Sequence, residues 1–107
     1  MRLILRPKQG GKTTELINLS AENGGYIVCH TRNEAYRIRT QAREMGLFIP
    51  LPLTYIEFFN RQLYPPGVKR FLIDNVEMLL QFIARDILIE AVTCTPDILD
   101  QSVSEGR

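Results

Sequence analysis

The sequence predicts an α/β fold, a three-layer sandwich in which helices cover both faces of a small parallel sheet of about four strands. Two observations predict this class. Short apolar runs rich in Ile, Leu and Val suit strands that are covered on both faces. These runs alternate with helical patterns in the order strand, helix, strand, helix, helix, strand, helix, strand, which is typical of right-handed parallel crossovers. We expect one domain over residues 1–101 and a disordered tail at 102–107.

The composition is that of an ordinary globular protein. Hydrophobic residues make up 45% and charged residues 23%, which argues against wholesale disorder and against a miniprotein built on disulfides. No apolar run reaches the roughly 18 residues of a membrane span, and the first apolar stretch is too short for a secretory signal. We therefore expect a cytoplasmic protein that does not enter a membrane. We expect Cys29 and Cys94 to be reduced core residues, with a disulfide between them as the alternative.

Four apolar runs are the expected strands. They are Arg2–Arg6, Tyr26–His30, Arg70–Asp74 and Ile89–Thr95. The expected helices lie between and after them. They are Lys12–Asn23, Asn33–Met45, a short helix that opens at Thr54–Glu57, and Val76–Ala84. Two helix starts carry a hydroxyl followed three residues later by a carboxylate, which is the spacing of a capping box.

The segment Arg6–Thr14, between the first strand and the first helix, carries the most specific motif. Gly11, Lys12 and Thr13 match the end of a phosphate-binding loop, G-x-x-x-x-G-K-[ST]. Glycines let backbone amides face a phosphate, and the helix that follows directs its partial positive charge there. The motif assigns the terminal phosphates to Lys12, magnesium to Thr13 and the first phosphate to Thr14.

One position departs from that motif. Arg6 stands where the first glycine belongs, so the loop begins without the freedom of glycine at positive φ. The alternative is a glycine-rich turn with a surface lysine. The context favours the phosphate loop, because the segment follows an apolar strand and opens a helix.

A second feature is the apolar strand that ends in Asp74. A carboxylate at the carboxyl end of a parallel strand can orient magnesium through water. The alternative is that Asp74 caps the helix that follows.

Together, Gly10–Thr14 and Leu72–Asp74 resemble the P-loop NTPases of the helicase- and RecA-like branch. The chain is also similar to small ATPase-like proteins of phages and mobile elements. This resemblance implies a sheet of order 1-4-3-2, with ATP or another nucleoside triphosphate and Mg²⁺ as cofactors. The residues implied for the nucleotide are Gln9, Gly10, Gly11, Lys12, Thr13 and Thr14, and those for the metal are Thr13 and Asp74. Lys12 is implied for catalysis, and Glu77 is a second catalytic candidate because it lies near Asp74 in the sequence.

Hydrolysis depends on a group that orients the attacking water. The resemblance implies a Glu after the strand-terminal Asp, but this chain has Asn75, and an amide cannot accept a proton as a carboxylate does. Glu77 is the candidate replacement; alternatively it is a solvated carboxylate in the first turn of a helix. We therefore expect weak hydrolysis or none.

A basic stripe follows the second expected helix. Its members are Arg32, Tyr36, Arg39 and Arg43, spaced i, i+4, i+7 and i+11. Such a stripe suits a nucleic-acid backbone with a base stacked on the tyrosine, or it is a solvated helix face.

Three functions stay open from the sequence. The first is a nucleotide-binding protein of the P-loop type. The second is a non-enzymatic module derived from that fold, such as a phage inhibitor of a host system, which contacts nucleic acid or a protein. The third is one subunit of a larger motor. In the expected order, Arg2–Arg6 is an edge strand, so we expect it to pair with a second copy or a protein partner.

Overall fold

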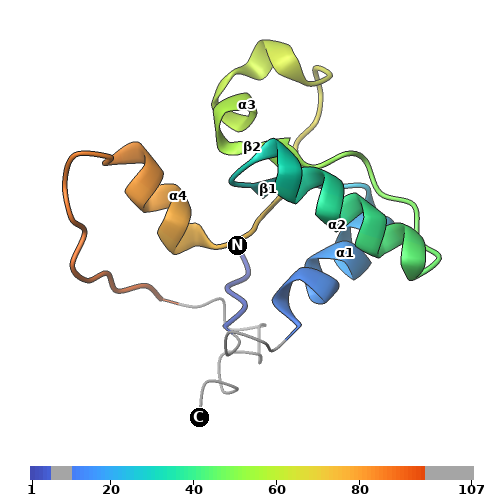
Figure 1. The fold of residues 1–107 in the computed structure, drawn as a ribbon, viewed down its shortest axis with the longest axis horizontal. Helices are drawn as coiled ribbons and strands as arrows, with labels where there is room; N and C mark the ends of the chain where they lie inside the picture. The colour runs from blue at the N-terminus through green and yellow to red at the C-terminus, as the bar shows by residue number, and fades with distance from the viewer. Residues whose placement is uncertain (6–10, 96–107) are drawn as a thin grey trace.

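The computed structural model describes residues 1–5 and 11–95, and their elements follow the expected α/β alternation only in part (Figure 1). The elements in chain order are α1 (Lys12–Asn23), β1 (Tyr26–Cys29), α2 (Arg32–Glu44), β2 (Leu53–Thr54), α3 (Tyr55–Phe59), the 3-10 helix η1 (Arg61–Leu63), β3 (Phe71–Ile73) and α4 (Val76–Ile83).

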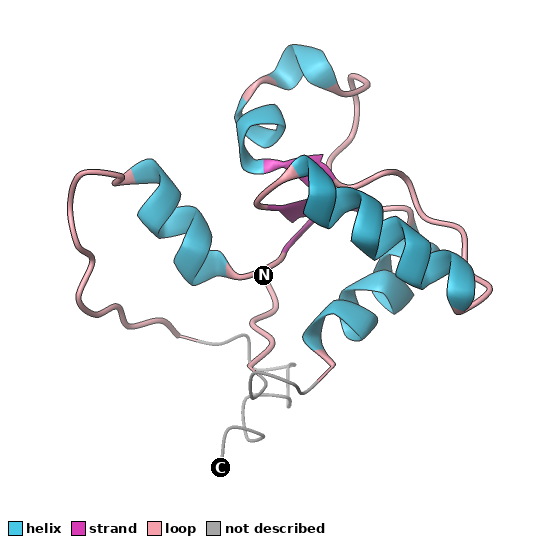
Figure 2. Ribbon diagram, in the orientation of Figure 1, coloured by secondary structure: helices cyan, strands magenta, loops and turns pink. Residues whose placement is uncertain are grey.

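The sheet confirms the predicted α/β class with parallel strands. Within the described residues it has three strands in the order β2-β1-β3 (Figure 2). Both pairings are parallel, with Val28 opposite Leu53 and Ile73 at once. The pairing of β1 with β3 agrees with the predicted adjacency of the second and third strands.

A sheet of four strands in the order 1-4-3-2 is not confirmed. Residues 2–5 and 89–95 form no strand, whereas the unpredicted β2 occupies one edge. A strand requires a neighbouring ladder of hydrogen bonds, and the segment around Leu88 and Val92 lies exposed on the surface instead, at 82% and 61% exposure. The hypothesis that Arg2–Arg6 is an unpaired edge strand therefore loses its basis for residues 2–5; Arg6 lies outside the described residues.

The core lies on both faces of the sheet because consecutive residues of β1 point in opposite directions. Ile27 and Cys29 belong to the larger cluster, which contains residues of α1 and α2. Val28 faces the other side, where it packs with a smaller cluster formed by Leu53, Tyr55 and Leu79. Helices thus cover both faces, as in an α/β sandwich.

The predicted helices are confirmed, with ends that shift by one residue at most. The first ends at Gly24, whose φ of 77° is left-handed. At the start of α2, Thr31 accepts a hydrogen bond from the Glu34 amide, but the Glu34 carboxylate pairs with Arg37 rather than closing a capping box. The complete box occurs at α3, where Thr54 and Glu57 bond each other's backbone amides.

Both cysteines are free, as predicted, but only one of them is in the core. Cys29 is 1% exposed, whereas Cys94 lies on the surface. The placement of Cys94 corrects the prediction of two buried thiols; it follows from the absence of a strand over 89–95. Across residues 1–5 and 11–95, no helix is long and apolar enough to cross a bilayer.

Candidate nucleotide site

The candidate site lies at the carboxyl edge of the sheet, where parallel α/β folds bind ligands. Asp74 and Asn75 directly follow β3, and His30 and Thr31 directly follow β1. The amino end of α1 reaches the same edge, because Lys12 contacts Asn75. Three elements distant in sequence therefore meet here.

Lys12 is the first residue of α1, directly after Gly11, whose φ is 80°. That left-handed conformation favours glycine, so the backbone conformation explains why the motif has a glycine at this position. The Lys12 ammonium nitrogen lies 3.4 Å from the Asn75 side-chain oxygen. It is thus near the helix end that carries the partial positive charge. Gln9 and Gly10, the other predicted loop residues, lie outside the described residues.

Asp74 is the most unusual residue at this edge. It is 4% exposed, and among the described residues no donor forms a hydrogen bond with its carboxylate. Burial raises the pKa of Asp74, and the positive charge of Lys12 opposes that rise. A buried carboxylate without a donor is costly, so this group has an unmet need for a cation or a donor.

The backbone around Asp74 is fixed, although its side chain has no donor in the described part of the chain. Its amide donates to the Val28 carbonyl at 2.9 Å, and its carbonyl accepts the Tyr55 hydroxyl at 3.0 Å. The alternative that Asp74 caps α4 is wrong, because the cap residue is Asn75 and no side-chain cap bond forms.

Asn75 adopts a left-handed backbone, with φ at 59°, and among the described residues it alone does so without being glycine. Asparagine tolerates this conformation better than most residues. Its side chain points to Lys12 instead of capping α4. The turn geometry therefore gives a structural reason for an Asn where the resemblance implies a Glu.

Tyr55 fixes the turn after β3 and was not predicted as a residue of the nucleotide site. It is 1% exposed, and its hydroxyl donates to the carbonyls of Asp74 and Asn75, at 3.0 and 3.2 Å. Burial raises its pKa to about 12, so it stays a donor at neutral pH. His30 stacks on its ring with a centroid distance of 5.4 Å. The capping box at Thr54 predicted the start of α3, but no local signal predicts a contact with residues 74 and 75.

The two threonines of the motif have different surroundings. The Thr14 hydroxyl accepts a hydrogen bond from the Gln41 side chain at 3.1 Å, which connects α1 to α2. The Thr13 hydroxyl has no hydrogen-bond partner among the described residues and is half-buried in the first turn of α1. Thr13 is therefore the hydroxyl that has its bonding capacity left for a ligand.

Glu77 is exposed in the first turn of α4. Its charge contributes to the raised pKa of Asp74, yet within the described chain no hydrogen bond or ion pair joins it to Lys12. In this geometry Glu77 is a first-turn carboxylate of α4, as the alternative interpretation has it.

A protein-only metal cage does not form in the described parts of the chain, which hold no group of three or more His, Cys, Asp or Glu suited to a metal ion. Magnesium does not need such a cage, because it usually keeps several waters and takes one or two protein ligands plus substrate phosphates. Thr13 and the Asp74 carboxylate supply ligands of the oxygen type that Mg²⁺ requires.

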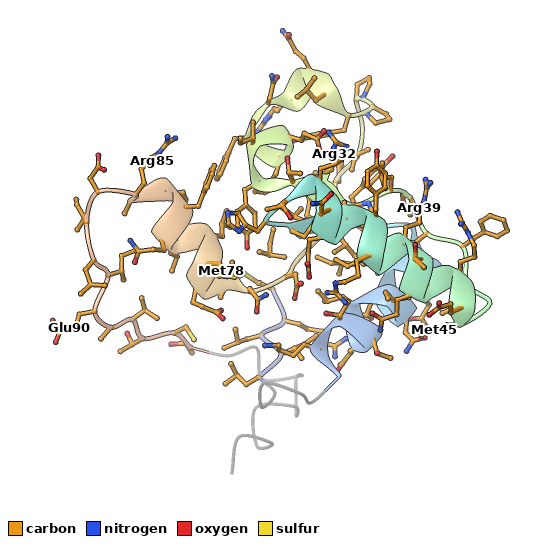
Figure 3. The ribbon with its side chains drawn as sticks, viewed as in Figure 1. Arg32, Arg39, Met45, Met78, Arg85 and Glu90 are labelled. Atoms are coloured by element: carbon orange, nitrogen blue, oxygen red, sulfur yellow. The ribbon has the colours of Figure 1, made fainter. Side chains whose placement is uncertain are left out.

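The basic stripe of α2 divides into two parts (Figure 3). Arg32 pairs with Glu57 of α3, so its charge is compensated. Arg39 and Arg43 have no ion pair or hydrogen bond within the described chain, and Tyr36 is half exposed. The stripe is thus not a uniform surface of free cations.

No protein-family model, curated protein or solved structure matches this chain. Lys12, Thr13 and Asp74 are the described residues whose chemistry suits a ligand at the carboxyl edge of the sheet.

Proposed function

We propose that this protein binds a nucleoside triphosphate, with ATP as the first candidate, together with Mg²⁺ at the carboxyl edge of its sheet. The single observation that carries the proposal is the buried Asp74 carboxylate, which has no hydrogen-bond donor among residues 1–5 and 11–95 and lies within the field of Lys12 at the start of α1. An ammonium, a hydroxyl and a carboxylate at a helix amino end suit a magnesium-bound phosphate chain.

Each residue has a distinct part in the proposal. Lys12 exchanges its Asn75 contact for phosphate oxygens, and the amide groups of the first turn of α1 face the same anion. Thr13 and Asp74 hold the ion, which when bound neutralises phosphate charge. Thr14 stays bonded to Gln41 and adds a contact to the first phosphate. Gln9 and Gly10 complete the loop by the motif.

Hydrolysis is slow or absent in this proposal. Asn75 follows the strand-terminal Asp and its amide oxygen contacts Lys12, so it accepts no proton from water. Glu77 is exposed and one helical turn away. A missing general base typically costs about 10²- to 10⁴-fold in rate.

Thermal unfolding with and without MgATP tests binding. A ligand at a hundredfold excess over Kd stabilises the folded state by about 2.7 kcal/mol, which for a domain of this size raises Tm by an amount on the order of 10 °C. Lys12→Ala should abolish the shift, whereas Lys69→Ala, which removes an exposed lysine on the loop before β3, should keep it. No shift with any nucleoside triphosphate would refute the proposal.

One observation favours a second candidate, a non-enzymatic module that has lost nucleotide binding. The Lys12 ammonium already has a partner in Asn75 without any ligand. This candidate predicts no shift with MgATP, so the same unfolding experiment separates the two functions.

A further inference from the structure

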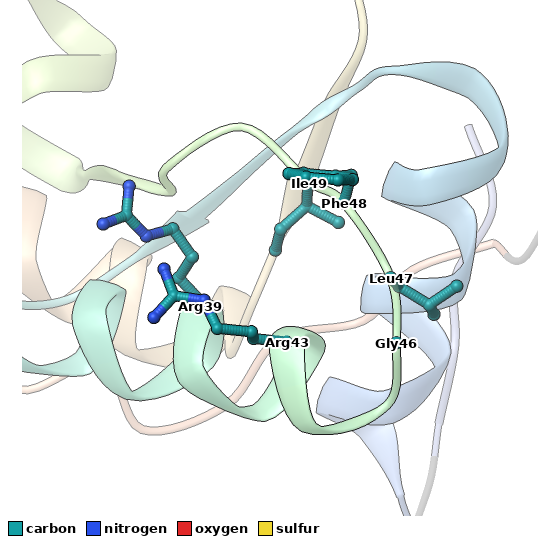
Figure 4. Close-up of a pocket in the computed structure, with 6 residues that line it drawn as sticks. All are labelled: Arg39, Arg43, Gly46, Leu47, Phe48 and Ile49. Carbon is teal, nitrogen blue, oxygen red and sulfur yellow. The ribbon is translucent and has the colours of Figure 1, made fainter.

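A groove lies beside the carboxyl-terminal half of α2, away from the nucleotide site. Its volume is about 490 Å³, and it is lined by Arg39, Arg43 and the loop Gly46–Ile49 (Figure 4). Because α2 begins directly after β1 and connects two parallel strands, its last turns lie at the amino edge of the sheet. The groove and the carboxyl-edge site are therefore separate.

The wall formed by α2 is positively charged. Arg39 and Arg43 are one turn apart on the helix, and neither has an acidic partner in the parts of the chain that the structure describes. Among the described residues, none that lines the groove is acidic. Arginine side chains in this arrangement suit phosphate groups, because each offers a planar set of donors.

The opposite wall is apolar and ends in an aromatic ring. Leu47 and Ile49 are anchored, since both pack against the larger core cluster. Phe48, between them, is 97% exposed. A fully exposed phenylalanine held between two anchored neighbours thus lines the same groove as two arginines that have no ion pair in the described chain (Figure 4).

The spacing along α2 extends this surface. Tyr36 is half exposed and lies on the same helix face as Arg39 and Arg43, at i, i+3 and i+7. The rise from Tyr36 to Arg43 is about 10 Å at 1.5 Å per residue, so a strand of a few nucleotides spans this part of the helix.

We propose that this groove binds single-stranded nucleic acid, with phosphates on Arg39 and Arg43 and a base stacked on Phe48. Cation contacts that follow the backbone and aromatic rings that stack on bases are the two parts of single-strand recognition. Tyr36 stacks on a neighbouring base. Arg32 takes no part, because Glu57 compensates its charge.

A substitution that adds a fluorophore tests the stacking directly. The chain has no tryptophan, so Phe48→Trp introduces the only one, and a base stacked on it quenches its fluorescence. We expect quenching on addition of oligo-dT or oligo-rU. Comparison of the two oligonucleotides shows whether the groove prefers DNA or RNA. Phe59→Trp, the same change at a half-exposed phenylalanine that does not line the groove, should show no quenching.

The fluorescence anisotropy of a labelled oligonucleotide tests separately the contributions of stacking on Phe48 and of the arginine–phosphate contacts. Phe48→Ala should weaken binding at least about fivefold without changing the salt dependence. Arg39→Gln or Arg43→Gln should each reduce the slope of log K against log salt by about 0.7, whereas Arg61→Gln on η1 should not. The proposal is overturned if the oligonucleotide does not bind at low salt, if Phe48→Ala has no effect, or if a duplex binds equally well. These readouts do not involve Lys12, so they stand apart from nucleotide binding.

Discussion

The ammonium nitrogen of Lys12 lies 3.4 Å from the side-chain oxygen of Asn75, although the two residues are 63 positions apart in the sequence. This contact joins the first residue of α1 to the turn after β3 and closes the carboxyl edge of the sheet. The contact also gives Lys12 an internal partner, although Lys12 is the cation that a bound phosphate would require. The proposed nucleotide therefore competes with Asn75 for Lys12.

That competition predicts a gain in affinity when the amide is removed. Asn75→Gly should strengthen MgATP binding, because Lys12 loses its internal partner while glycine keeps the left-handed φ of 59° at little cost. Isothermal titration measures the change. Asn75→Ala is the matched control for backbone strain: it removes the same contact but should lower the free energy of unfolding by roughly 1 kcal/mol or more. Weaker binding in Asn75→Gly would contradict competition.

Asn75→Glu tests the chemistry at the same position. If the turn places residue 75 near the attacking water, the added carboxylate should raise phosphate release within the range of about 10²- to 10⁴-fold that a general base supplies. The variant should also be less stable, since Glu tolerates a left-handed backbone less well than Asn. Wild-type turnover that is lost in Glu77→Gln would instead assign the role to Glu77.

Asp74 predicts a pH dependence of stability. Burial raises its pKa in the folded state, so the native protein binds more protons than the unfolded chain between the ordinary value of about 3.9 and the raised one. Its contribution to stability therefore falls as pH rises through that window. In denaturant unfolding, Asp74→Asn should lack this decrease with pH. Its free energy of unfolding at neutral pH should be higher than that of the wild type.

The same variant separates the metal from the nucleotide. Asp74→Asn should abolish the part of ATP affinity that depends on magnesium and leave the binding measured in excess chelator unchanged. An equal loss in both conditions would show that Asp74 acts through the fold of the loop instead.

Tyr55→Phe tests how much the Tyr55 hydroxyl contributes to stability and to nucleotide binding through the turn after β3. Its single hydroxyl proton is shared between the buried Asp74 carbonyl and the part-buried Asn75 carbonyl, and an unsatisfied buried group costs about 1–3 kcal/mol. We expect reduced stability together with weaker nucleotide binding. Tyr64→Phe is the control, because that hydroxyl donates to the Phe58 carbonyl, away from residues 74 and 75. It should reduce stability without changing the affinity.

The two thiols should differ sharply in reactivity. Burial raises the pKa of Cys29 to about 12, whereas Cys94 lies on the surface. Since the thiolate is the reactive form, an alkylating reagent should label Cys94 in the native protein and Cys29 only after unfolding. Peptide mass analysis locates the label, and rapid modification of the native Cys94→Ala variant would contradict the burial of Cys29.

The sequence by itself determined the local structure. Helix signals at Gly24, Thr31 and Thr54 predicted three helices within one residue, because capping chemistry acts between residues that are close in the chain. The density of Ile and Val in Tyr26–His30 likewise predicted a buried strand, since residues covered on both faces must all be apolar.

Tertiary structure alone decided which segment occupies the other side of β1 and which partners the polar groups find. The apolar pattern of Ile89–Thr95 was sufficient for a strand, yet a strand also needs a ladder neighbour, and that segment lies on the surface while Leu53–Thr54 pairs with β1. No local signal indicated the Tyr55 bonds to residues 74 and 75, the left-handed φ of Asn75 or the exposure of Phe48. The physical reason is range: a cap or a turn is decided by a few neighbouring residues, whereas these features depend on which distant segments pack together.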